Sequence, residues 1–81
     1  MSEPIHFLVE QAGCESCAQR VRSALADVLT IEEISVDEGA DLAAVRAQAP
    51  PTLKPAAVDA ALAEASRGSG HTYRVRPGSW R

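Results

Sequence analysis

The chain has 81 residues, a formal net charge of −3 and 46% hydrophobic residues, which allows one small domain with a modest core. The acidic balance and the scattered basic residues argue against nucleic acid as a partner. No apolar stretch approaches the roughly 20 residues that a membrane-spanning helix needs, and the N-terminus lacks the pattern of a signal peptide. We therefore expect a cytoplasmic protein without direct membrane insertion.

The first half of the chain begins with a strand pattern and continues with a helix pattern. Ile5, Phe7 and Val9 alternate with more polar residues, which predicts a strand over residues 4–10 with one buried face. After a short loop, apolar residues recur at helical spacing over residues 16–29. A serine at the start of this segment is the expected helix cap.

The second half of the chain predicts a strand pair, a helix and a last strand. Strands are expected over 31–37 and 42–47, because a turn-like Glu-Gly-Ala-Asp sequence separates two apolar segments. A proline that suits a first helical turn and a glycine that suits the exit bound a helix over 55–67. The final strand is expected over 72–76, with Tyr73 facing the core.

The order of these elements is strand, helix, strand, strand, helix, strand. It predicts an α+β fold of the ferredoxin-like βαββαβ type, in which a four-stranded antiparallel sheet carries two helices on one face. We expect a single domain over residues 1–76, followed by a frayed C-terminal tail over residues 77–81.

Cys14 and Cys17 are the only cysteines, and they lie between the first predicted strand and the first predicted helix. A three-residue separation lets both sulfurs reach one ion, and two thiolates suit Cu(I), Hg(II) or Ag(I), whereas Zn(II) prefers four ligands. In the reducing cytosol we expect both thiols to be reduced and available for metal. The same pair also suits a glutaredoxin-like thiol-disulfide oxidoreductase, and this alternative stays open.

The residues around the cysteine pair resemble the heavy-metal-associated domain family. This family includes copper chaperones, mercury-binding proteins and the metal-binding domains of heavy-metal P-type ATPases. The similar segments are Phe-Leu-Val-Glu-Gln-Ala-Gly-Cys-Glu-Ser-Cys at residues 7–17, Ala-Gln-Arg-Val-Arg-Ser-Ala-Leu at 18–25 and Ile-Glu-Glu-Ile-Ser-Val-Asp at 31–37. The resemblance covers about Phe7 to Val75.

The resemblance implies a heavy-metal-binding protein that is not an enzyme. More specifically, it implies a soluble Cu(I) chaperone that passes its ion by thiolate ligand exchange to a metal-transporting P-type ATPase or its soluble metal-binding domain. A mercury or zinc carrier on the same fold is the alternative within the family. A metal-bridged homodimer is also expected to be accessible, since two such loops can share Cu(I) ions.

The resemblance assigns Cys14 and Cys17 as metal ligands and places His71 beside the metal, in the loop before the last strand. A neutral His71 imidazole would be a third ligand, and a charged one would offset the negative bis-thiolate. The third interpretation, an exposed histidine without a role, stays open.

Three residues of the metal loop depart from the family pattern. Gln11 replaces a usual glycine, Ala12 replaces a methionine that props the loop, and Gly13 replaces a common threonine. Because Ala12 and Gly13 offer little side-chain support, we expect a more mobile loop than in typical members.

Overall fold

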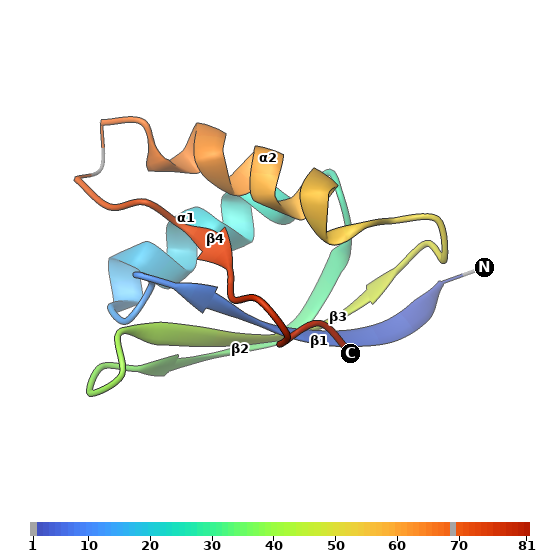
Figure 1. Cartoon of the computed structure of the whole chain (residues 1–81), viewed down its shortest axis with the longest axis horizontal. Helices are drawn as coiled ribbons and strands as arrows, with labels where there is room; N and C mark the ends of the chain where they lie inside the picture. The colour runs from blue at the N-terminus through green and yellow to red at the C-terminus, as the bar shows by residue number, and fades with distance from the viewer. Residues whose placement is uncertain (1, 69) are drawn as a thin grey trace.

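The computed structural model describes residues 2–68 and 70–81, and it confirms the ferredoxin-like βαββαβ arrangement. Four strands form one antiparallel sheet in the order β2-β3-β1-β4, and both helices lie on the same side of it (Figure 1). No helix in the described ranges is long and apolar enough to cross a membrane. The elements are β1 (Glu3–Glu10), α1 (Glu15–Leu25), β2 (Thr30–Asp37), β3 (Leu42–Ala49), α2 (Pro55–Ser66) and β4 (Arg74–Val75).

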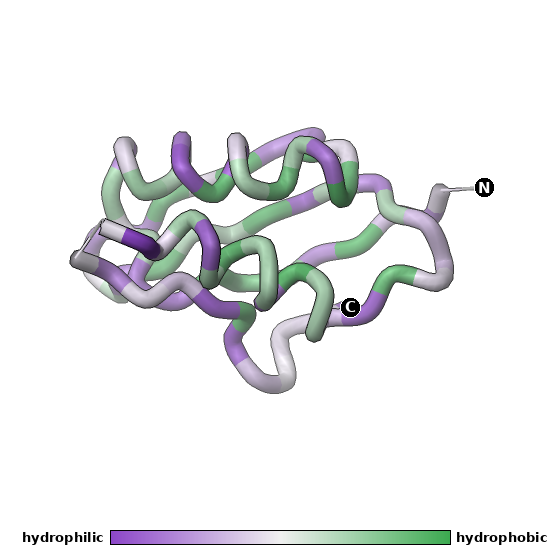
Figure 2. Tube along the Cα trace, turned by 90° about the horizontal axis from the view of Figure 1, so that it is seen from above, coloured by the Kyte–Doolittle hydropathy of each residue, from purple (hydrophilic) through white to green (hydrophobic). Residues whose placement is uncertain are grey.

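The central strand pair builds the floor of the core. β1 and β3 pair along their full length, and Phe7 and Val9 of β1 lie opposite Val45 and Ala43 of β3. All four side chains are fully buried beneath the helices. Hydrophobic and hydrophilic residues are interspersed along the helices and strands (Figure 2). The alternation that predicted the strands therefore also separates a buried face of the sheet from an open one.

Helix α1 ends earlier than its apolar spacing predicted. The pattern runs on to Leu29, but the helix stops at Leu25 and a turn follows. The carbonyl of Leu25 accepts hydrogen bonds from the amides of both Val28 and Leu29, at 3.0 Å each. Leu29 is buried beyond this turn, so the spacing reflects two different elements that pack on one core.

Strand β4 covers two residues, although a longer strand over 72–76 was expected. Two side chains of α2 accept hydrogen bonds from backbone amides of β4 and of the residue before it. The Ser66 hydroxyl accepts from the Tyr73 amide at 2.9 Å, and Asp59 Oδ1 accepts from the Val75 amide at 2.7 Å. The helix thus holds an edge strand that pairs with β1 over only a short stretch.

The C-terminal tail is not frayed, contrary to the sequence-based expectation. His6 of β1 and Arg81 exchange two backbone hydrogen bonds, at 3.0 and 2.8 Å. The neighbouring residue Trp80 stacks on Phe7 with the ring centroids 5.1 Å apart. The tail therefore continues the sheet edge beyond β4 and covers part of the core. The boundary between the domain at 1–76 and the tail at 77–81 stays a prediction.

Candidate metal centre

Cys14 forms the N-cap of α1, a role that the sequence assigned to Ser16. Its backbone is extended, with φ −137° and ψ 160°, and its sulfur accepts a hydrogen bond from the Cys17 amide at 3.2 Å. The Ser16 hydroxyl lies 3.5 Å from the same sulfur. Free amides and the helix dipole favour negative charge at this position. The local structure is therefore suited to a thiolate at Cys14.

The two cysteines meet in space and form a disulfide in this structure. Their Cα atoms are 5.1 Å apart, within the range that a disulfide spans. This oxidised pair differs from the reduced pair that the sequence predicted. The geometry allows this bond, because the N-cap and the first helical turn place both sulfurs at the same helix end. Metal binding needs the reduced form, since the thiolate is the ligand.

The two sulfur-bearing residues differ in their exposure. Cys17 is 2% exposed and belongs to the hydrophobic core, whereas Cys14 is half-buried at its border. An incoming ligand therefore reaches the pair from the side of Cys14. Cys17 anchors the pair to the core through its position in α1.

Gly13 lies directly against the β2–β3 turn. Its amide donates to Asp41 Oδ1 at 3.1 Å. A Cβ atom at position 13 would lie 2.8 Å from that oxygen and 2.9 Å from the Asp41 carbonyl carbon, which leaves no room for a side chain. Asp41 itself has φ 55°, in the left-handed region that aspartate tolerates better than most residues. The glycine is thus required by a close approach.

The other two unusual loop residues also have structural roles. Gln11 has φ 62°, which explains why glycine is the usual residue at this position in the family. Its Oε1 accepts a hydrogen bond from the Thr72 amide at 3.1 Å. Ala12 is fully buried in the core. The expected loss of loop support is therefore not what the structure shows, because two neighbouring loops hold the metal loop by hydrogen bonds.

His71 lies in the loop before β4, as predicted, and is exposed. Its ring stacks on Tyr73 with centroids 5.8 Å apart and an interplanar angle of 14°. Within residues 2–68 and 70–81, no group of three or more His, Cys, Asp or Glu side chains is placed to hold a metal ion. The structure brings Cys14 and Cys17 together but does not join His71 to them as a ligand cluster. The role of His71 stays a prediction.

Sequence reasoning missed Asp41, which supports the metal loop from outside it. The available signal was a pair of features at one end of the predicted sheet. Gly13 lacks a side chain there, and a turn ending in aspartate lies at the same end. Their contact spans 28 positions of the chain, which no local pattern encodes.

The fold and the cysteine pair together define a small metal-binding domain. The family model of the heavy-metal-associated domain matches residues 6–68. A comparison with curated proteins found no match. Because the family match covers more than half of the chain, the protein belongs to the heavy-metal-associated domain family, whose members bind heavy-metal ions. β4 and the C-terminal tail lie beyond the matched residues.

Proposed function

We propose that the protein is a cytoplasmic, non-enzymatic Cu(I) carrier. In the reduced protein, the thiolates of Cys14 and Cys17 bind one ion and pass it to a dithiol on a partner. The observation that supports this proposal is the sulfur pair at the N-terminus of α1, where the Cys17 amide donates to Cys14 Sγ. A reducing compartment is part of the proposal, because the disulfide has no thiolate to offer.

The donor set supports Cu(I) over Zn(II). Two soft sulfur ligands satisfy Cu(I), which accepts low coordination, whereas Zn(II) in proteins takes four ligands. Within the described ranges, no third His, Cys, Asp or Glu side chain forms a metal-binding cluster with the two cysteines. Hg(II) and Ag(I) share the preference for sulfur and belong in the same test.

The different exposure of the two sulfurs suggests an order for the transfer. A thiolate of the partner would bind the ion on the exposed side, and Cys14 would then leave before Cys17. The expected recipient is a metal-transporting P-type ATPase or its metal-binding domain. Two copies of the chain would also form a homodimer by sharing Cu(I) between their cysteine loops.

The proposal is tested by titrating the reduced protein with Cu(I) in competition with a strong chelator. We expect one ion per chain and a loss of affinity of more than about 100-fold for Cys14→Ser and for Cys17→Ser, since even a residue that only orients a ligand changes affinity 10- to 100-fold. Ser23→Ala, an exposed change on α1, is the matched control. Binding that survives both cysteine substitutions contradicts the carrier function. Repeating the titration with Zn(II) and Hg(II) tests the choice of metal.

A thiol-disulfide oxidoreductase is the second candidate, and the disulfide between Cys14 and Cys17 is the observation that favours it. Such an enzyme would reduce a mixed disulfide between glutathione and a substrate, while Cys14 and Cys17 cycle between the dithiol and the disulfide. Turnover of a glutathione mixed disulfide, lost in Cys14→Ser, would support this candidate. Tight Cu(I) binding without such turnover would exclude the oxidoreductase and support the Cu(I) carrier.

A further inference from the structure

Strand β2 forms an outer edge of the sheet, and no strand of the described ranges pairs with its outer side (Figure 1). Its pairing with β3 is irregular between Ile31 and Glu33 but regular over 34–37. Irregular edges resist the addition of another strand, whereas regular ones accept it. The second half of β2 is therefore the part of this edge that is competent to pair.

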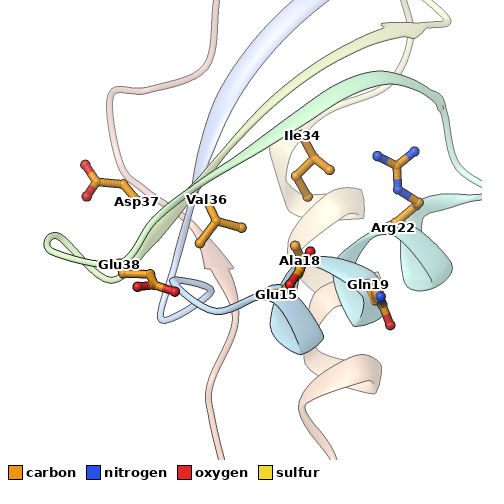
Figure 3. A pocket seen from close by; sticks show the side chains of 8 residues that line it. All are labelled: Glu15, Ala18, Gln19, Arg22, Ile34, Val36, Asp37 and Glu38. Atoms are coloured by element: carbon orange, nitrogen blue, oxygen red, sulfur yellow. The ribbon is translucent and has the colours of Figure 1, made fainter.

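A groove of about 870 Å³ runs between α1 and this half of β2 (Figure 3). Ala18, Ile34 and Val36 contribute its apolar surface. Val36 is 36% exposed, and no other large hydrophobic residue in the described part of the chain is classed as exposed. A strand added to the β2 edge would place every second side chain on the side of the sheet where this groove lies.

The groove opens beside the metal loop and is acidic at that end. Glu15, which lies between the two cysteines in sequence, and Glu38 flank this end, whereas Arg22 lies at the other end (Figure 3). Asp37 also lines the groove. The carboxylates of Glu15 and Glu38 would attract a basic residue beside the metal loop.

The charges along β2 also distinguish between two kinds of occupant. The strand and the residue that follows it carry Glu32, Glu33, Asp37 and Glu38. A second copy of this chain, paired edge to edge, would bring these carboxylates close to one another, and like charges on facing strands are destabilising. A strand that carries Lys or Arg would instead meet opposite charge.

We propose that the outer edge of β2 over residues 34–37, together with the α1–β2 groove, binds a basic, extended segment of the protein that receives the metal. The segment adds as a strand, places branched apolar side chains in the groove and places a Lys or Arg near Glu15 and Glu38. Backbone hydrogen bonds supply affinity, and the alternate side chains supply specificity. The identity of the occupant as the recipient rests on the proposed function, but the docking itself needs no metal.

The test uses blocked synthetic hexapeptides and the full, reduced, metal-free protein labelled with ¹⁵N. An alternating Lys-Val hexapeptide is the probe, and alternating Glu-Val and Lys-Ser hexapeptides are its charge and apolar controls. We expect the Lys-Val peptide alone to shift the amides of residues 34–37 and of Ala18 and to slow hydrogen exchange along the β2 edge. The shifts should weaken as salt is added.

Glu38→Lys should raise the dissociation constant of the Lys-Val peptide about three- to fivefold. Glu3→Lys, which makes the same change at an exposed position of β1, should change it less than about twofold. Cu(I) affinity, measured in parallel, should be the same in both variants, so a failure to bind metal and a failure to dock are distinguishable.

Three results would overturn the proposal. The first is an equal response to the Glu-Val peptide, and the second is a set of shifts gathered away from β2. The third is a concentration-dependent shift of the β2 amides without peptide, which would show that a second copy of the chain occupies the edge.

Discussion

Asp41 occupies the space that a side chain at Gly13 would need. The Gly13 amide donates to Asp41 Oδ1 at 3.1 Å, and a Cβ atom at position 13 would collide with the Asp41 backbone. The contact joins the β2–β3 turn to the loop that carries both cysteines. A residue outside the metal loop therefore sets the path of that loop.

Gly13→Ala should destabilise the protein, because the new Cβ meets the backbone of Asp41, which cannot rotate out of the way. Overpacking of this kind costs about 1–3 kcal/mol of unfolding free energy. Thermal unfolding followed by circular dichroism measures the loss. Gly39→Ala is the matched control, since a Cβ there meets only Asp37 Oδ1 at an ordinary 3.6 Å. Equal stability of the two variants would contradict the close approach.

Substitutions at Asp41 should separate its hydrogen bond from its backbone conformation. Asp41→Asn keeps the acceptor oxygen and accepts φ 55°, so the free energy of unfolding should change by less than about 0.5 kcal/mol. Asp41→Ala loses the acceptor and keeps the left-handed backbone, which should cost about 1–2 kcal/mol. Asp41→Gly relieves the backbone and should lie between them. Urea unfolding of the reduced protein gives this order, and any other order would assign the contact a different role.

Trp80 should contribute to stability through its contact with Phe7. Trp80→Ala removes a half-buried ring that stacks on Phe7 and should lower the free energy of unfolding by about 1–2 kcal/mol. Trp80→Phe retains an aromatic ring and should recover more than half of that loss. Circular dichroism measures both variants. A frayed tail would instead make both substitutions neutral, which would contradict the docked arrangement.

Asp59 should stabilise β4, because its carboxylate accepts the Val75 amide at 2.7 Å. Asp59→Ala leaves that amide without its partner and should cost about 1–2 kcal/mol. Asp59→Asn keeps an acceptor and should cost less. Hydrogen exchange offers the direct measurement, since the Val75 amide should exchange faster in the alanine variant while the amides of β3 stay protected. Unchanged exchange at Val75 would show that another group holds this amide.

The predicted elements agree with the structure where local pattern decides and differ where distant contacts decide. Alternation placed Phe7 and Val9 in the core, and the helical spacing placed Val21 and Leu25 there too. The same spacing predicted too long a helix α1, because Leu29 reaches the core after a turn that follows the helix. A helical pattern records which residues are buried, not which element buries them.

The metal loop shows the same division. The cysteine spacing, together with the strand before it and the helix after it, located the cysteine pair, because a strand followed by a helix fixes where such a loop lies in this fold. Ala12 and Gly13 looked like lost side-chain support when compared with the family. The loop is held instead by contacts with Thr72 and Asp41, which lie far away in the sequence.

The sequence by itself determined the order of elements, the buried faces and the position of the two sulfurs, since these follow from short-range periodicity and spacing. The tertiary structure alone decided that Asp41 supports Gly13, that α2 holds β4 and that the tail closes the core over Phe7. Each of these is a contact between residues remote in the chain. Such contacts depend on how the layers pack, and periodicity carries no record of that packing.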